Sequence, residues 1–295
     1  MNSKITNRIA LTVVYLCAAV MAIILVALLG YILVKGVSNI TWQSLISPSA
    51  LVNSGIRDQL WNSFYVLIIT MIFTIPIGVC GGIYLAEYAR AGKLTAFVRS
   101  CVEMLASLPS IIVGMFGMIM FVTYLHLGFS VISGALALTV FNLPVVVRVT
   151  EDGFRALSLK QKEGGLALGL THWHTIKKIL LPAAFPSILT GVILSAGRVF
   201  GEAAALLYTG GNSTSWALDF TNWNPFSTTS PLNVLHSAET LSVHIWSLRN
   251  TPLPGLDYNA VANESAAVLV ICVLIFNLLA RAVGKLIHQK LTGKA

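Results

Sequence analysis

The stretch Leu60-WNSFYVLIITMIFTIPIGVCGGIYL-Ala86 decides the fold. Its 27 residues include no Asp, Glu, Lys or Arg, and Ala10–Val34 forms a second uncharged run of 25 residues. About 20 apolar residues are enough to cross the hydrocarbon core of a bilayer as a helix. Because lipid offers the backbone no hydrogen-bond partner, a spanning segment must be helical or belong to a closed barrel, whose strands are short and alternate in polarity. The sequence therefore predicts an all-α membrane protein.

The composition supports this class. Hydrophobic residues make up 56% of the 295 residues and charged residues only 10%, whereas roughly a quarter of the residues in soluble domains are charged. The first run follows Lys4 and Arg8, which is also the charge pattern of a secretory signal peptide. It is much longer than the roughly 7 to 15 apolar residues of a signal core, so we expect an uncleaved span.

Three more stretches complete the topology. Met104–Val147 contains 44 uncharged residues, too many for one span, and Tyr124–Gly128 interrupts it. This pattern predicts a helical hairpin of two spans. Two further spans are expected at Ala183–Tyr208 and Asn263–Leu286. The total is six transmembrane helices.

The basic residues orient these spans. Fifteen of the 19 Lys and Arg residues lie on the face that carries both termini, three lie on the other face (Lys35, Arg57 and Arg249), and Arg198 lies inside the fifth span. Because cytoplasmic loops are enriched in Lys and Arg, we predict that both termini are cytoplasmic. The basic residues that border the spans also account for the formal net charge of +8, so we expect the lipid bilayer and no nucleic acid as a partner.

The cysteines and histidines indicate neither a metal nor a cofactor site. The four cysteines lie in or at the edge of apolar runs without a C-x-x-C spacing, and the six histidines form no H-E-x-x-H motif. These are the spacings that common zinc sites and redox sites use. We therefore expect no metal and no cofactor in this chain.

Arg198 and Glu202 are the first candidates for a substrate path. They lie four residues apart, which on a helix places them on one face of the fifth span, near its middle and outer half. Charged side chains inside a bilayer are costly and normally face the bundle interior or an aqueous path. The planar fork of Arg198 suits an oxyanion, and Glu202 can hold that fork or accept a hydrogen bond from a protonated anion. The alternative is a mutual ion pair that clamps adjacent spans, and one pair can serve both purposes.

Ser107-Leu-Pro109-Ser110 at the start of the third span is the second candidate. The proline removes a backbone donor, so we expect the helix to break there. Broken spans often line transport sites, and the hydroxyls of Ser107 and Ser110 can help to replace the hydration of an anion. The alternative is a kinked helix that serves packing alone. The same choice between gating and packing applies to Gly78 and Gly82 in the second span.

The loop between the fourth and fifth spans carries the most informative motif. It contains Glu163-Gly-Gly-Leu-Ala-Leu-Gly169, then nine residues, then Ile179-Leu-Leu-Pro182. This pattern resembles the E-A-A-x3-G-x9-I-x-L-P signature of ABC importer permeases. The resemblance implies a helical segment that docks on an ATP-binding subunit. Glu163, Gly164, Gly165, Gly169, Ile179, Leu181 and Pro182 are the residues that match the signature. Two glycines stand where the signature has alanines, and each costs about 1 kcal/mol of helix stability, so we expect a looser docking helix.

Three further stretches resemble the phosphate ABC importer permeases of the A (PstA) type. They are Ser107–Gly114, Gly197–Leu207, and Asn224–Phe226 together with Ala238–Trp246. The resemblance covers nearly the whole chain and implies a type I ABC importer permease in the cytoplasmic membrane of a bacterium. It also implies four partner subunits or proteins: a homologous second permease, two ATP-binding subunits and an extracytoplasmic phosphate-binding protein. ATP and Mg²⁺ then belong to the partners, because this chain lacks a G-x-x-x-x-G-K-[ST] loop and is not expected to be an enzyme.

Other functions remain open at this point. Within the permease class, the substrate can instead be another oxyanion such as sulfate or molybdate. A secondary anion transporter would use Arg198 and Glu202 for ion coupling without a cytoplasmic motor. A purely structural membrane protein would need neither a charge inside the fifth span nor the loop motif.

The expected domain organisation follows the topology. Residues 1–58 form an accessory transmembrane helix and outer loop, residues 59–288 form the permease core with its coupling loop at 149–182, and residues 289–295 form a cytoplasmic tail. The long outer segment from Thr209 to Ala262 contains Trp216, Trp223 and Trp246. Because tryptophan is enriched at membrane interfaces, we expect an ordered outer lid.

Overall fold

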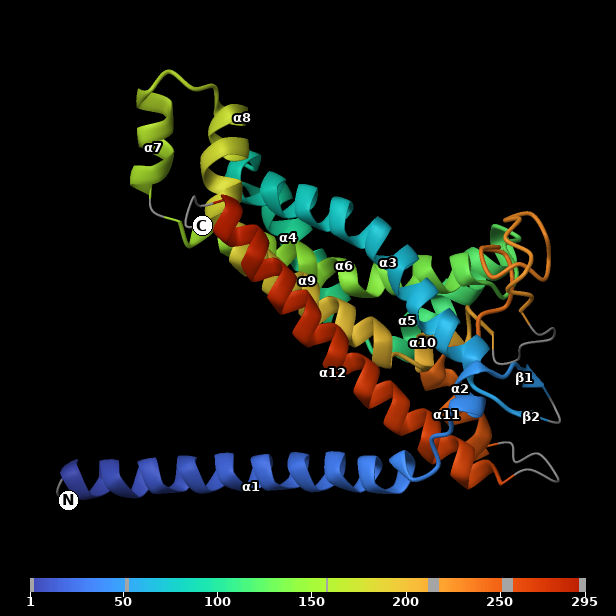
Figure 1. The fold of residues 1–295 in the computed structure, drawn as a ribbon. Coiled ribbons are helices and arrows are strands. Elements are labelled where there is room, and N and C mark those ends of the chain that lie inside the picture. The colour runs from blue at the N-terminus through green and yellow to red at the C-terminus, as the bar shows by residue number, and fades with distance from the viewer. Residues whose placement is uncertain (1–2, 51–52, 158, 212–217, 251–256, 292–295) are drawn as a thin grey trace.

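The computed structural model describes residues 3–50, 53–157, 159–211, 218–250 and 257–291. Helices dominate this part of the chain (Figure 1), and the predicted all-α class is confirmed. The longer helices are α1 (Ser3–Val37), α3 (Arg57–Ile83), α4 (Lys93–Ser107), α6 (Val131–Arg155), α9 (Leu181–Gly201), α11 (Leu241–Asn250) and α12 (Tyr258–Leu291). The shorter ones are α2 (Trp42–Ile46), α5 (Ser110–Gly117), α7 (Leu159–Ala167), α8 (His172–Thr175) and α10 (Ala204–Leu207).

Short irregular elements connect these helices. Three π-helical segments continue α3, α5 and α8, at Tyr84–Tyr88, Met118–Tyr124 and Ile176–Leu180. In the described part of the chain, the strands are a single antiparallel pair of two residues each, β1 (Ser49–Ala50) and β2 (Asn53–Ser54). This small β-hairpin lies between α2 and α3 and leaves the helical architecture unchanged (Figure 1). As labels only, we call the end of the bundle that carries α7 and α8 the inner end and the opposite end the outer end.

Six spans are present if one bent helix pair is counted as a span. Five continuous helical stretches are long and apolar enough to cross a bilayer: Asn7–Val37, Arg57–Tyr88, Val131–Arg155, His172–Gly201 and Tyr258–Ile287. The sixth candidate consists of α4 and the stretch Ser110–Tyr124, which meet at an angle of 102°. The predicted number of spans is therefore confirmed with the bent pair as the third.

The third span breaks at the predicted proline but begins earlier than the uncharged run indicated. Leu108 and Pro109 have extended backbones with ψ of 135° and 137°. With the bent pair counted as one span, the span begins at Lys93, and Met104 lies in α4, before the 102° bend. None of the 15 residues of α4 is buried. The two halves of this span therefore point in clearly different directions on either side of the proline.

The fifth span is shorter than expected. We predicted one helix over Ala183–Tyr208, but α9 ends at Gly201, and Glu202 has an extended backbone with φ −75° and ψ 123°. The chain re-forms one short turn as α10 before it enters the outer loop. Within the predicted coupling loop at 149–182, α6 continues to Arg155 and α9 begins at Leu181; the bounds of the loop as a cytoplasmic segment stay a prediction.

The core of the bundle is the contact between α3 and α6. Gly78 and Gly82 of α3 form a G-x-x-x-G pair, and a Cβ on Gly78 would lie 2.7 Å from Val146 of α6. A Cβ on Gly82 would lie 2.6 Å from the carbonyl oxygen of Val147. Small residues let helices approach closely in membranes. In the second span, these glycines therefore serve close packing.

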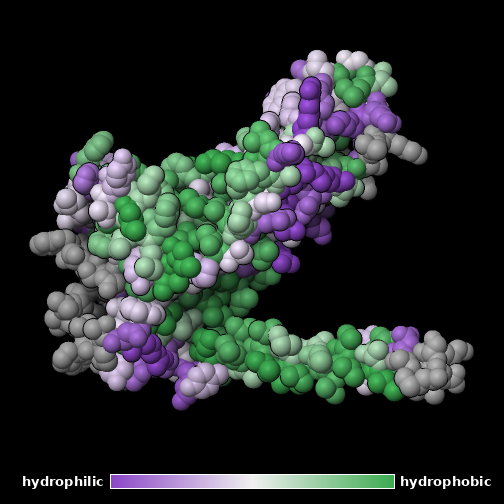
Figure 2. All heavy atoms as spheres, turned by 180° about the vertical axis from the view of Figure 1, so that it is seen from behind, coloured by the Kyte–Doolittle hydropathy of each residue, from purple (hydrophilic) through white to green (hydrophobic). Residues whose placement is uncertain are grey.

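Helix α1 stands apart from the bundle. Its apolar window is 0% buried within the chain. It contacts α12 near its C-terminal end, where Gly36 packs against Asn263 and Ala267, and it diverges from α12 towards its N-terminus (Figure 1). Figure 2 shows α1 as a separate apolar rod and an apolar band over the body, with hydrophilic residues gathered towards the two ends. The separation of α1 agrees with an accessory first span, although the proposed division at residue 58 stays a prediction.

Candidate functional site

Arg198 lies in the last turn of α9, where the fifth span breaks. Its guanidinium carbon is 3.8 Å from the centroid of the Phe141 ring in α6, which is a cation–π arrangement. Arg198 also lines a pocket of 480 Å³ between α6, α9 and α12. The other lining residues are Val145, Ile193, Leu194, Ser195, Gly197, Val273 and Asn277.

The neighbouring helix α12 gives the depth of this pocket. The side chain of Asn277 packs against the backbone of Gly197, since a Cβ there would lie 3.6 Å from Nδ2 of Asn277. At about 1.5 Å per residue, Asn277 is about 28 Å from the first residue of the apolar stretch Tyr258–Ile287 and about 15 Å from its last. Arg198 is therefore deep within the span of α12. A guanidinium at this depth does not face hydrocarbon, so it faces water or another protein surface.

The break in the third span lies close to the break in the fifth. Gly114 of α5 packs against Ala205 of α10, and Gly117 packs against Thr209, so the two segments run in parallel. Ser110 is half-buried, whereas Ser107 is exposed and its hydroxyl donates to the carbonyl of Met104 at 2.8 Å. Of the two predicted serines, Ser110 thus belongs to the segment that packs along α10, one turn before Gly114, and Ser107 ends α4.

Glu202 has a different environment from the one we expected. Because it ends α9, it does not continue the helical face of Arg198, and no ion pair between the two occurs among the described residues. Its carboxylate accepts a hydrogen bond from the backbone N–H of Ala205 at 3.3 Å and so caps α10. Its carbonyl oxygen accepts from the hydroxyl of Ser242 in α11 at 2.8 Å. Glu202 shapes the break, and Arg198 is left without the carboxylate that the helical spacing predicted.

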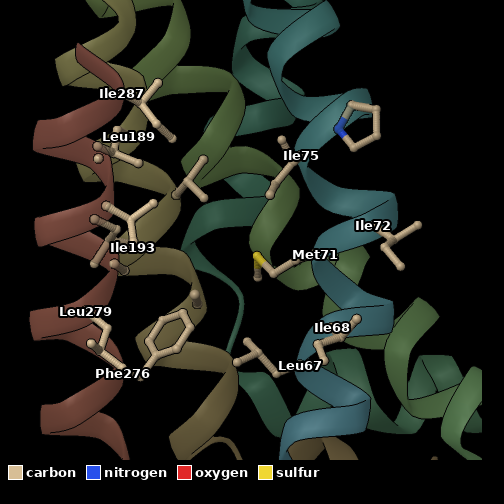
Figure 3. Close-up of a pocket in the computed structure, with 16 residues that line it drawn as sticks. Leu67, Ile68, Met71, Ile72, Ile75, Leu189, Ile193, Phe276, Leu279 and Ile287 are labelled. Atoms are coloured by element: carbon tan, nitrogen blue, oxygen red, sulfur yellow. The ribbon is translucent and has the colours of Figure 1, made fainter. Parts of the chain in front are cut away.

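A second hollow, of 690 Å³, lies between α3, α9 and α12 (Figure 3). Every side chain that lines it is apolar, including Met71, Ile193 and Phe276. An anion transferred there would lose its hydration without any compensating hydrogen bond. This hollow is therefore a surface for lipid or protein and not the anion site.

Residues 159–175 project from the inner end of the bundle, and we call them the coupling hairpin after the role that the sequence motif predicts (Figure 1). Helix α7 ends in a turn in which Gly169 has φ +77°, a left-handed conformation that favours glycine. Thr171 caps α8, and the chain then runs helically through Ile176–Leu180 into α9. Pro182 lies in the first turn of α9, directly after this π-helical segment. The hairpin is thus joined by continuous helix to the segment that carries Arg198.

The two glycines of α7 have different environments. A Cβ on Gly165 would lie 2.7 Å from Thr175 and 2.8 Å from Ile179, so only glycine lets α7 pack this closely on the following helix. A Cβ on Gly164 would meet nothing within 4 Å. The neighbouring Glu163 is exposed, as are the apolar side chains of Leu168 and Trp173. The exposed face of the hairpin therefore combines a carboxylate with large apolar side chains.

Glu87, which sequence reasoning missed, ties the hairpin to the body of the protein. It lies in the π-helical segment that ends the second span. Its carboxylate is 2.6 Å from the ammonium of Lys162 in α7, and the two groups form an ion pair without the angles of a regular hydrogen bond. The same carboxylate is 3.7 Å from Nε2 of His172, whose ring packs edge-on against Tyr88. A single acidic residue at the inner end of an otherwise uncharged span was the available signal. This ion pair connects α7 to α3 directly.

A second ion-pair cluster holds α4 at the inner side. The guanidinium of Arg99 donates to Glu151 of α6 at 3.0 Å and to the carbonyl of Leu85 at 3.2 Å. Arg155 approaches the same carboxylate at 2.9 Å. These contacts join α4, the inner end of the second span and α6. They position the bent third span against the helices that carry the core.

The outer rim is tied to α3 by buried polar groups. The Glu239 carboxylate is 3.0 Å from Nδ1 of His244 and accepts from the amide of Gln59 at 3.1 Å. Nε2 of His236 is 3.0 Å from Oδ1 of Asn62, and burial lowers the pKa of His236 despite the nearby charge of Asp58. The described part of the outer segment is therefore ordered, as expected for a lid. Trp216, part of that expectation, lies outside the described residues.

The comparisons with known proteins define the class. Residues 78–293 match the family described as "Binding-protein-dependent transport system inner membrane component". This match covers more than half of the chain, and the protein belongs to that family. It is an ABC importer permease subunit, a transport component of the inner membrane that is typically not an enzyme.

Individual relatives narrow the similarity further. The chain is 56% identical over 295 residues to the "Probable ABC transporter permease protein YqgI" of Bacillus subtilis (strain 168), covering 99% of this chain and 100% of that protein. It is 30% identical over 280 residues to the "Phosphate transport system permease protein PstA" of Haemophilus influenzae, covering 94% and 93% of the two chains. The sequence resemblance to PstA-type permeases is thereby confirmed.

Solved structures agree on the fold. A chain of a bacterial ABC transporter that imports the acidic polysaccharide alginate matches with a TM-score of 0.62 and 14% identity, covering 96% of this chain and 99% of that one. A chain of the MetNI methionine ABC transporter in an inward-facing conformation matches with a TM-score of 0.56 and 16% identity, covering 80% and 95%. At this level of identity, the likeness supports the type I permease architecture and nothing about the substrate.

Proposed function

We propose that the chain is the permease subunit of an ATP-driven importer of inorganic phosphate. The observation that carries this proposal is Arg198, a guanidinium held against an aromatic ring deep in the span and unpaired with any described carboxylate. A free planar fork suits a tetrahedral oxyanion. The relatives named PstA support phosphate as that oxyanion.

The proposed mechanism is alternating access driven through α9. The coupling hairpin docks on an ATP-binding partner, which holds ATP and Mg²⁺, and a movement of the hairpin is carried along continuous helix to the Arg198 pocket. Two ATP-binding subunits, a homologous second permease and an extracytoplasmic phosphate-binding protein complete the proposed assembly. Both termini are then cytoplasmic, on the side of the hairpin.

The test is uptake of radiolabelled phosphate by vesicles that contain the assembled complex and its binding protein. Phosphate uptake that requires internal ATP supports the proposal. Uptake driven by an ion gradient without ATP would favour a secondary transporter. Sulfate or molybdate uptake in place of phosphate would keep the permease class and replace the substrate.

A matched pair of variants tests the hairpin. Glu163→Arg is expected to abolish ATP-coupled uptake while the protein still inserts in the membrane, because it reverses the exposed charge that matches the family signature. Gln161→Arg changes an exposed side chain of the same helix and is expected to retain uptake. Normal uptake by Glu163→Arg would contradict the proposed docking surface.

A further inference from the structure

The Arg198 pocket contains a second polar side chain that can contact an anion. Asn277 of α12 lines the same pocket as Arg198 and packs against Gly197, the residue before it. It lies on a different helix, so the two side chains come from separate walls. The helical spacing that drew attention to Glu202 gave no reason to consider Asn277, because 79 residues separate it from Arg198 in the sequence.

The hydrogen bond that Asn277 makes within α12 determines which of its side-chain atoms is available to an anion. Its Nδ2 donates to the carbonyl oxygen of Val273 in the preceding turn at 2.8 Å. Only the amide nitrogen can partner a carbonyl oxygen, so the orientation of the side-chain amide is determined. Oδ1 receives no hydrogen bond from any residue in the described ranges. Asn277 therefore presents an acceptor, whereas Arg198 presents donors.

A donor fork and a neutral acceptor together select a particular kind of anion. Inorganic phosphate keeps at least one proton at neutral pH and can donate it to an acceptor, whereas sulfate has no proton to donate. An acceptor oxygen that finds no donor repels a fully deprotonated oxyanion. Because the acceptor is neutral, it does not form an ion pair with Arg198 and leaves the fork available. Moderate binding also suits a transport site, which must release what it binds.

We propose that Asn277 contacts the substrate: its Oδ1 accepts a hydrogen bond from the protonated oxygen of the oxyanion held by Arg198. This contact favours protonated oxyanions over sulfate. This inference rests on the proposed phosphate import. It assigns the acceptor role that we first gave to Glu202 to a residue that lines the pocket.

The experiment measures anion binding without the binding protein, whose own selectivity would otherwise mask that of the permease. Phosphate binding to the detergent-solubilised complex of permeases and ATP-binding subunits is followed by ³¹P saturation-transfer NMR, with sulfate as competitor. Asn277→Leu removes the acceptor at similar size. We expect it to weaken phosphate binding roughly three- to tenfold, as the loss of one hydrogen bond does. Sulfate should bind as before or better, so the preference for phosphate falls.

Asn277→Asp and Leu278→Ala serve as companion variants. The aspartate keeps an acceptor oxygen, so sulfate should remain excluded even if phosphate turnover slows. Leu278 is 69% exposed and does not line the pocket, and its variant should keep the wild-type preference. Uptake by the wild-type vesicles tests the proposed function separately.

Two results would overturn the inference while phosphate import stands. In the first, Asn277→Leu changes phosphate and sulfate binding by the same factor, as a purely structural residue would. In the second, the wild-type complex imports phosphate but shows no saturable phosphate binding by itself.

Discussion

The charged side chains at the two ends of α9 have different environments. At the inner end, the charges of the coupling hairpin are either paired with the body, as Lys162 is with Glu87, or exposed, as Glu163 is. At the other end, Arg198 rests on an aromatic ring with no carboxylate partner in the described part of the chain. The same helix therefore joins a region where charges hold parts of the chain together to one where the charge of Arg198 has no ion-pair partner among the described residues.

This difference indicates how one helix can serve both tasks. The ion pair of Glu87 ties the hairpin to the end of the second span, so the hairpin contacts the helix that continues α3 as well as α9. The pocket end has a break instead of a lock, because Gly201 ends the helix and Glu202 caps the next turn. A continuous helix at the inner end can transmit a rigid-body movement, and a break at the outer end is a point where the helix can bend to open or close a transport path.

The largest expected effect is at the free charge. Arg198→Ala should reduce phosphate uptake roughly tenfold to a hundredfold, because hydrogen bonds to a charged group are lost. Arg198→Lys should retain part of the uptake, since an ammonium keeps the charge but lacks the planar fork. Uptake of radiolabelled phosphate at matched expression measures both, and co-purification of the ATP-binding subunits controls for assembly. Equal uptake by the alanine variant and the wild type would show that transport does not need the charge of Arg198, and the two ends of α9 would then not differ in this respect.

The next effect concerns the paired charge. Glu87→Lys should reduce uptake roughly tenfold, because it places two ammonium groups together where the pair is largely shielded from water. Lys162→Glu should do the same with two carboxylates. The double exchange should restore much of the uptake and the number of ATP molecules hydrolysed per phosphate imported. If the double variant is no better than the single ones, the pair does not carry the coupling.

A smaller effect distinguishes the two glycines of the hairpin. Gly165→Ala should destabilise the packing of α7 by about 1–3 kcal/mol, because the added methyl group meets Thr175 and Ile179. Gly164→Ala should stabilise α7 by about 1 kcal/mol, because it gains helix propensity in open space. Hydrogen exchange of the α7 amides measures both changes. Equal protection in the two variants would show that the close contact at Gly165 does not determine the hairpin geometry.

Much of the fold follows from the sequence, because the bilayer constrains it. Uncharged runs of 25 or more residues have few alternatives to a spanning helix, and the proline at 109 marked a break that the structure contains. The break after Gly201 was missed because it depends on tertiary contacts, in particular the hydrogen bond from Ser242 to the carbonyl of Glu202. The available signal was Gly201, because glycine is common where helices end.

The candidate site was predictable in part for the same reason. A charge inside an apolar run identifies Arg198, and a spaced motif identifies Glu163 and Gly169. Partners from distant segments were not predictable, because Asn277 and Glu87 meet their neighbours only through the packing of separate helices. Local spacing even suggested the wrong partner for Arg198, since Glu202 would share its face only if the helix continued.

The smallest expected effect lies at the outer rim, away from both ends of α9. His236 has a pKa lowered from 6.5, chiefly by burial, although the carbonyl of Asn233 and the charge of Asp58 favour its protonated form. The folded state therefore favours the neutral ring. Stability should be complete above pH 6.5 and should decline as the pH falls from 6.5 towards the lowered pKa, by at most about 1.4 kcal/mol per pH unit.

His236→Gln removes this titration and can still donate to Asn62. Between pH 7.5 and 5.5, the thermal midpoint of the wild type should fall by about 2–4 °C more than that of the variant. Both proteins keep His172 and His244 with their contacts to Glu87 and Glu239, so the difference between the two isolates His236. An equal acid loss in the two proteins would show that His236 does not determine the acid sensitivity.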